Sequence, residues 1–132
     1  MAEAKAARGS IPRVTTLKKR AEYLRVRNGA RCATPAFVLE AKARRDEDRA
    51  RPMDEPRFGF TITRQVGKAV ERNRIRRRLK SAVRDMAPRH AKSEFDYVLI
   101  ARRPALTAAF AALVSELVKA LARVHRAPAR AR

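Results

Sequence analysis

The stretch KAVERNRIRRRLKSAVR, Lys68–Arg84, decides both the expected fold and the expected partner of this chain. It contains eight Lys or Arg residues and one acid, Glu71, yet its apolar residues keep a helical spacing. Counted from Ile75, the apolar positions follow at offsets of four, seven, eight and eleven: Leu79, Ala82, Val83 and Met86. This spacing predicts a helix over about 68–86, with one face buried in a core and Pro88 at its end.

The opposite side of this helix carries polar and cationic residues at the same spacing, namely Asn73, Arg77, Lys80 and Arg84. A charge run is usually a solvated face, but here the acids that would balance such a face are missing. The pattern therefore favours a phosphate-binding surface. Arg72 and Arg74 fall on the flanks of the helix, so we expect the contact to wrap around its first turns rather than follow one stripe.

The composition points to one domain with a polyanionic partner. A chain of 132 residues with 45% hydrophobic content can bury a single modest core. Its 33 basic and 13 acidic residues give a formal charge of +20, which favours binding to a polyanion. The cations are mostly Arg, which favours planar phosphate contacts of nucleic acid over a membrane surface. No apolar run approaches the roughly 20 residues of a membrane span, and the N-terminus lacks the apolar core of a signal peptide, so we expect a cytosolic protein.

The rest of the chain predicts two more helices and three strands. The first helix is expected over about Leu17–Arg27, capped by Thr15 or Thr16, with Leu17, Ala21 and Leu24 facing inward and Asn28-Gly29 as its stop. Strands are expected over 36–41, 57–63 and 95–101, and the nearly continuous apolar run of the third favours the sheet centre. A long amphipathic helix after Pro104 is expected to bury the following side chains: Leu106, Phe110, Leu113, Val114, Leu117, Leu121 and Val124.

This order of elements predicts an α+β fold with helices packed on a small sheet. We expect the folded domain over 15–126, a flexible basic arm over 1–14 and a short basic tail over 127–132. The mixed charges and prolines of 42–56 predict an exposed connection. Propensity alone would make the crossover through residues 57–101 right-handed, as about 98% of such connections are.

The centre of the basic helix resembles the signature of the bacterial ribonuclease P protein family. Its core Arg72-Asn73-Arg74 follows Gly67-Lys68-Ala69-Val70 and precedes Ile75-Arg76-Arg77. The resemblance also covers Leu17-Lys18-Lys19 with Tyr23 one turn later, Phe37-Val38-Leu39, Arg57 with Gly59, and Asp96-Tyr97 leading to Ala101-Arg102-Arg103-Pro104. The two tails and the 42–56 segment fall outside it.

The resemblance implies a mixed sheet of about four strands with three helices, and a left-handed β-α-β crossover through the Arg-Asn-Arg helix. It implies the protein subunit of an endoribonuclease, which binds a catalytic RNA and the 5′ leader of precursor tRNA in the cytoplasm. The RNA, with its own Mg²⁺, would then remove the leader to give the mature 5′ end. The protein would bind no cofactor or metal tightly, supply no catalytic residue, and pair one to one with the RNA.

Two sets of binding residues follow from the resemblance. The set expected to contact the catalytic RNA is Lys68, Arg72, Asn73, Arg74, Arg76, Arg77, Lys80 and Arg84. The set expected to contact the leader, in a cleft between the first helix and the sheet, is Lys18, Arg20, Tyr23, Arg27, Phe37 and Arg57. Clustered cations neutralise phosphates, and an aromatic ring beside cations suits single-stranded RNA.

Three leader positions carry alternatives. Phe37 is equally compatible with the core. Arg27 and Glu40 stand where the family commonly shows aromatic residues, which reduces the stacking surface. Arg27 can stack or pair with a phosphate, whereas Glu40 would repel one.

Two other functions compete with this one. A ribosome-associated or general RNA-binding protein would share the charge and the fold. A protein-only nuclease would need a catalytic set, and the acids Asp46, Glu47, Asp48, Asp54 and Glu55 read as a solvated loop. His90 and His125 have no evident acid-base partner and are expected at the surface. The single cysteine, Cys32, excludes an intramolecular disulfide and is expected in or near a strand.

Overall fold

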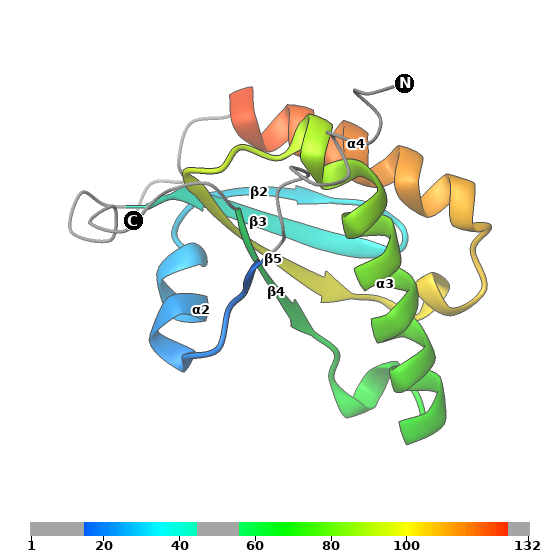
Figure 1. The fold of residues 1–132 in the computed structure, drawn as a ribbon. Helices are drawn as coiled ribbons and strands as arrows, with labels where there is room; N and C mark the ends of the chain where they lie inside the picture. Colours follow the sequence, from blue (N-terminus) through cyan, green and yellow to red (C-terminus); the bar gives the residue numbers. More distant parts are fainter. Residues whose placement is uncertain (1–14, 45–55, 127–132) are drawn as a thin grey trace.

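The computed structural model describes residues 15–44 and 56–126. The arm expected at 1–14, the tail expected at 127–132 and the acids of the 42–56 segment lie outside these residues. The elements follow in the order β1 (Thr15–Thr16), α2 (Arg20–Val26), β2 (Ala30–Ala33), β3 (Phe37–Ala43), β4 (Arg57–Thr61), the 3-10 turn η2 (Arg64–Val66), α3 (Ala69–His90), β5 (Phe95–Ala101), the 3-10 turn η3 (Arg103–Leu106) and α4 (Phe110–Arg126) (Figure 1).

The described strands form one mixed sheet in the order β1-β4-β5-β3-β2. The central strand β5 is parallel to β4 and antiparallel to β3, while β1 is parallel to β4 and β2 antiparallel to β3. The expected mixed sheet and the central place of 95–101 are therefore confirmed, and Cys32 lies in β2 as expected. Because β4 and β5 are parallel neighbours, α3 forms the crossover between them. Its left hand stays a prediction from the family resemblance.

The two faces of the sheet are covered by different helices. Side chains alternate along β5, so that Tyr97 and Leu99 join one core while Val98 and Ile100 belong to another. The larger core lies under α3 and α4, and the smaller core holds Val26 of α2. Figure 1 shows α3 and α4 on one side of the strands and α2 on the other. No helix within the described ranges is long and apolar enough to cross a bilayer.

The expected buried face of the basic helix is confirmed by the structure. Its five members are at most 1% exposed: Ile75, Leu79, Ala82, Val83 and Met86. The expected end was wrong, because α3 continues through Pro88 to His90. Met86 and Ala87 are both buried, and their packing holds the last turn in place although proline cannot donate a backbone hydrogen bond there.

The first helix differs from its prediction at its start and on its inward face. Thr15 and Thr16 are not caps but form the edge strand β1, and the Leu17 N–H then bonds to the Phe58 carbonyl at 2.9 Å. Leu17 is buried before the helix begins at Arg20, whereas Ala21 and Leu24 are exposed. Val26 takes the buried position instead. The expected stop is confirmed, since the Gly29 N–H bonds to the Val26 carbonyl at 2.9 Å.

The last helix begins later than its apolar pattern predicted. Leu106 lies in η3, outside the helix, and Phe110 opens α4 with 41% of its surface exposed. Four of the expected positions, Leu113, Leu117, Leu121 and Val124, are buried as predicted. The connection after β3 is also shorter than expected, because β3 continues to Ala43 and Arg44 is buried.

Candidate nucleic-acid interface

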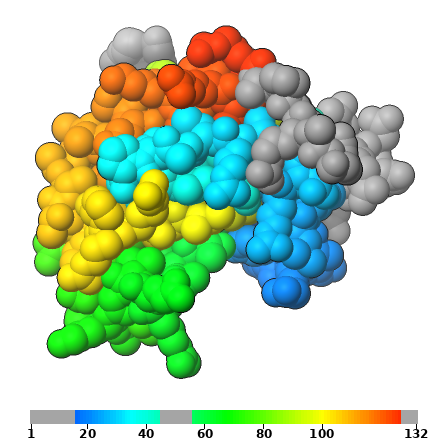
Figure 2. Space-filling view, turned by 180° about the vertical axis from the view of Figure 1, so that it is seen from behind, coloured from blue at the N-terminus to red at the C-terminus, as the bar shows by residue number. Residues whose placement is uncertain are grey.

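A groove of about 560 Å³ runs between α2 and α3 across β4 and β5. Figure 2 shows a notch in the surface between the blue segment around α2 and the green segment around the start of α3. The residues that line the groove are Lys18, Arg20, Tyr23, Leu24, Arg27, Glu40, Phe60, Thr61, Ile62, Arg76, Val98 and Ile100. Four of the six expected leader residues are therefore brought together: Lys18, Arg20, Tyr23 and Arg27.

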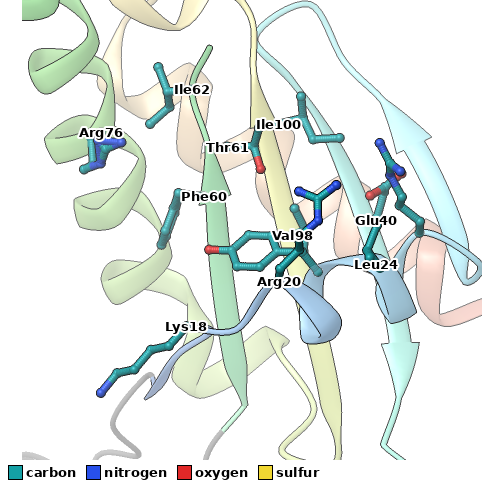
Figure 3. A pocket seen from close by; sticks show the side chains of 12 residues that line it. Lys18, Arg20, Leu24, Glu40, Phe60, Thr61, Ile62, Arg76, Val98 and Ile100 are labelled. Atoms are coloured by element: carbon teal, nitrogen blue, oxygen red, sulfur yellow. The ribbon is translucent and has the colours of Figure 1, made fainter.

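The groove combines cations with apolar surface. Lys18, Arg20 and Arg27 are exposed on its α2 side, and Arg76 enters from α3. Figure 3 shows Phe60 between β4 and α3, Val98 on the central strand, and Leu24 beside Glu40 at the α2 end. An apolar floor with cations at its edges suits a single-stranded nucleic acid, because bases stack or pack on the floor while phosphates meet the cations.

Tyr23 has its place in the groove because Gly59 has no side chain. A Cβ atom at Gly59 would lie 2.6 Å from the Tyr23 ring atoms Cε2 and Cζ. The Tyr23 hydroxyl donates to the Leu17 carbonyl at 3.4 Å, which ties the ring to the segment before α2. The Tyr23 ring therefore lies directly against strand β4.

Glu40 is the acid among the groove-lining residues, and its charge is already paired. It is 3% exposed, and its Oε2 accepts a hydrogen bond from Arg31 Nη1 at 3.1 Å. The expected repulsion of a phosphate by Glu40 is thus reduced by a neighbouring guanidinium. A base edge with N–H donors is a better neighbour for this carboxylate than a phosphate is.

Phe37 does not belong to the groove, so its assignment to the leader set was wrong. Its side chain is fully buried, and strand alternation places it in the larger core under α3 and α4. The core alternative for Phe37 is the one observed.

Arg57, the last member of the leader set, lies in a charged cluster behind the groove rather than among its lining residues. The centre of this cluster is Asp96, which is fully buried in β5. Arg57 donates to both of its oxygens, from Nε at 2.7 Å and from Nη2 at 2.6 Å. Arg25 of α2 adds a bond at 2.6 Å and Arg44 one at 3.0 Å, while Arg57 also reaches Glu22 at 3.1 Å.

Burial alone would raise the pKa of Asp96, but the hydrogen bonds from Arg57 and Arg25 and the charge of Arg44 outweigh it, so the pKa is lowered. Glu22 behaves in the same way: burial would raise its pKa, but the Lys19 and Lys18 N–H groups and Arg57 lower it. Both carboxylates therefore stay ionised and hold α2 against β4 and β5. The sequence offered one signal for this cluster, an acid inside an apolar strand, but not the identity of its partners.

The cations of α3 face two different surfaces. Arg76 lines the groove, and Lys80 Nζ lies 5.9 Å from the centre of the Phe60 ring, beside it. Arg74, Arg77 and Arg78 line two hollows on the other side, next to the start of α4. Asn73 and Arg84 are exposed between these sides, as expected. The predicted catalytic-RNA set thus occupies a ridge rather than one flat face.

Some polar groups of this ridge already have partners in the protein. Arg72 donates to the Gly67 carbonyl at 2.8 Å, and Arg78 donates to the Ala105 and Ala108 carbonyls. Glu71 accepts two bonds from Arg103, at 2.8 and 3.1 Å, and one from the Lys68 N–H at 2.9 Å. The Arg103 bonds, together with the Lys68 N–H, lower the pKa of Glu71 to about 2. The Glu71 carboxylate is therefore paired with Arg103, and it does not form an ion pair with the exposed arginines Arg74 and Arg77.

The five acids considered for a protein-only nuclease lie outside the described residues. Among residues 15–44 and 56–126, no group of three or more His, Cys, Asp or Glu side chains is placed to hold a metal ion. Both histidines are only partly exposed, and the His125 ring packs against Phe95 and Tyr97. Its Nε2 lies 2.7 Å from the Tyr97 hydroxyl.

The chain matches a family model and many curated proteins over most of its length. The model, described as Ribonuclease P, matches residues 11–125. A ribonuclease P protein component of Brucella suis is 47% identical over 110 residues, covering 82% of this chain and 78% of the relative. That of Paramagnetospirillum magneticum is 42% identical over 113 residues, covering 85% and 84%.

Solved structures show the same fold. The ribonuclease P protein of Staphylococcus aureus superposes with a TM-score of 0.65 at 26% identity, covering 85% of this chain and 98% of that one. The protein from Thermotoga maritima gives a TM-score of 0.66 at 24% identity, covering 83% and 96%. The chain therefore belongs to the ribonuclease P protein family, whose members act with an RNA subunit in processing the 5′ end of tRNA.

Proposed function

We propose that this chain binds the catalytic RNA of ribonuclease P through the ridge of α3, and the 5′ leader of precursor tRNA in the groove beside α2. The observation that carries the proposal is the groove itself, where Lys18, Arg20 and Arg27 lie along the α2 side of an apolar floor of β4 and β5. Such a surface suits an extended single strand, because it offers charge for the backbone and apolar contact for the bases.

The chemistry belongs to the RNA in this proposal, and the protein contributes charge and position. The magnesium ions needed for cleavage bind to the RNA subunit. The protein folds over residues 15–126, and one copy of it binds one catalytic RNA in the cytoplasm. A formal charge of +20 supports this role, because the arginines neutralise phosphates of RNA and substrate that would otherwise repel each other.

The two sides of α3 favour a division between its cations. Arg76 lines the groove and Lys80 lies beside Phe60, so we assign both to the leader side. Arg74 and Arg77 lie on the side away from the groove, so we assign both to the catalytic RNA. This changes the assignment that the sequence alone suggested for Arg76 and Lys80.

Two double variants test this division in the reconstituted holoenzyme. Replacing Arg76 and Lys80 with Ala is expected to weaken binding of precursor tRNA while leaving binding of mature tRNA, which has no leader, unchanged. Replacing Arg74 and Arg77 with Ala is expected to weaken binding of the protein to the catalytic RNA, and to reduce the slope of log affinity against log salt by about one per lost phosphate contact.

A matched control is Arg123→Ala, which removes an exposed arginine from α4. It is expected to leave both affinities near those of the unchanged protein. The division would be contradicted if the two double variants weakened binding of the leader and of the catalytic RNA to the same extent. The whole proposal would fail if the unchanged protein bound neither RNA.

A further inference from the structure

A second surface lies where α3 meets the start of α4. It consists of two adjoining hollows, which we call the α3–α4 surface. One is lined by Val70, Glu71, Arg74 and Leu106, among others, and the other by Arg74, Arg77, Ser81 and Phe110. Arg74 lines both hollows, so the surface is continuous. At 100° per residue, Arg74 lies about 160° and Arg77 about 100° from Arg76 around the helix. The α3–α4 surface therefore faces away from the leader groove.

Two large apolar side chains are exposed on this surface. Val70 is 72% exposed and Phe110 is 41% exposed, and Leu24 in the groove is the third such residue in the described part of the chain. Single exposed apolar residues are ordinary, but here two of them flank the same arginine. An aromatic ring beside cations is the combination that binds an unpaired base and its phosphates.

The charge of the surface is not balanced from within the described residues. Neither Arg74 nor Arg77 has a hydrogen-bond or ion-pair partner among residues 15–44 and 56–126. The acid that lines the first hollow, Glu71, is bound by Arg103, and the first turn of α4 contains no acid. The positive end of the α4 dipole therefore adds to the field of the arginines.

Arg78 fixes the geometry of this surface. Its guanidinium donates from α3 to the Ala105 and Ala108 carbonyls, in the segment that leads to Phe110. The backbone that leads to Phe110 is thereby tied to α3, which carries Arg74 and Arg77. A ligand that binds there does not have to order the two helices, which favours affinity.

We propose that the α3–α4 surface binds an unpaired nucleotide of the catalytic RNA, with its base on Phe110 and Val70 and its phosphates on Arg74 and Arg77. The inference rests on the proposed function and adds a site of base contact to it. The positive charge favours RNA over a protein partner or a second copy of this chain. Since the surface faces away from the groove, it suits the catalytic RNA rather than the leader.

The test compares Phe110→Ala, Phe110→Leu and Phe110→Trp for binding to the catalytic RNA. Phe110→Ala, which loses the stacking of one base, is expected to bind the RNA about 5- to 150-fold more weakly. Phe110→Leu keeps an apolar side chain but loses the ring, so it is expected to recover little, whereas Phe110→Trp retains affinity. The salt dependence is expected to stay unchanged, because no cation is removed. Unchanged melting temperatures verify that the variants fold.

Photo-crosslinking from p-benzoylphenylalanine at position 110 in the holoenzyme identifies the occupant. The proposal expects a crosslink to an unpaired nucleotide of the catalytic RNA. It is overturned if Phe110→Ala binds that RNA like the unchanged protein, if the crosslink joins the precursor tRNA leader or a second protein chain, or if Phe110→Leu equals Phe110→Trp. The affinity results, or a crosslink to a second protein chain, would leave the proposed function standing, whereas a crosslink to the leader would also contradict the placement of the leader beside α2. The proposed function itself fails if the unchanged protein does not bind the catalytic RNA.

Discussion

A single missing side chain, at Gly59, gives Tyr23 its place in the groove. We predict that Gly59→Ala destabilises the fold by about 1–3 kcal/mol, because its Cβ would overlap the Tyr23 ring. We also expect weaker binding of precursor tRNA relative to mature tRNA. Thermal unfolding and the two tRNA affinities measure these effects.

The double variant Gly59→Ala with Tyr23→Ala is the control for this overlap. Removing the ring removes the clash, so the alanine at position 59 is expected to cost less stability in the absence of Tyr23 than in its presence. Equal costs in both backgrounds would show that Tyr23 does not respond to the change at Gly59.

The residues of α3 also show what the sequence could and could not predict at this scale. The buried positions from Ile75 to Met86 follow from spacing, because burial repeats with the helical period. The roles of the arginines do not, since Arg74, Arg76 and Arg78 are chemically identical. Arg78 bonds to carbonyls about 30 residues away in sequence, and Arg76 faces a groove built by other elements. Such contacts depend on the tertiary arrangement.

At the scale of elements, the Asp96 cluster attaches α2 to the sheet. We predict that Asp96→Asn lowers the free energy of unfolding by about 3–5 kcal/mol, because Arg25, Arg44 and Arg57 lose the buried carboxylate that they share. Asp85→Asn, at an exposed position of α3, is the matched control and is expected to have little effect. Equal stability of the two variants in urea unfolding would contradict this role.

The same cluster predicts acid sensitivity. The pKa of Asp96 is lowered in the fold, so its contribution is present above the ordinary value of 3.8 and is lost as the pH falls below it. Asn does not titrate, so the free energy of unfolding of Asp96→Asn is expected to fall less than that of the unchanged protein as the pH is lowered below 3.8.

A second pH dependence is expected where α4 ends. The Tyr97 hydroxyl accepts the Lys92 N–H at 2.8 Å, which leaves its own proton for His125 Nε2 and favours a neutral imidazole. Burial, and then the charge of Lys92, lower the pKa of His125 below its ordinary 6.5. Below about pH 6.5 the unfolded chain therefore takes up a proton that the folded chain does not.

The free energy of unfolding is thus expected to fall as the pH falls from 7 to 5. His125→Gln keeps an acceptor for Tyr97 but does not titrate, so it is expected to flatten this part of the profile. Denaturant unfolding at several pH values measures the slope. An identical slope in the variant would contradict the assignment to His125.

The boundaries of the elements were less predictable than their existence. The segment 15–19 carries both helix-capping threonines and residues that fit a strand, and pairing with β4 decided in favour of the strand. The acid at Glu22, whose carboxylate bonds to the Lys19 N–H, was an available signal for the later helix start. Pro88 was a misleading signal, because packing of its neighbours outweighed its effect on the helix.

At the scale of the whole molecule, the two surfaces that we propose to bind RNA lie on different sides of α3. The mixed sheet and the central strand could be predicted from sequence pattern and family resemblance. The groove could be predicted in part, since the cations and Tyr23 were identified near the first helix. The burial of Phe37 could not be predicted, because side chains alternate between the two faces of a strand and the sequence does not say which face lies against the core.

The central claim is that the protein assists a catalytic RNA and does not itself cleave. The most direct measurement is cleavage of precursor tRNA at low magnesium concentration by the catalytic RNA alone, by the protein alone and by both together. The account predicts release of the leader at the mature 5′ end with both components, little cleavage with the RNA alone and none with the protein alone. Efficient cleavage by the protein without the RNA, or no stimulation of the RNA by the protein, would contradict it.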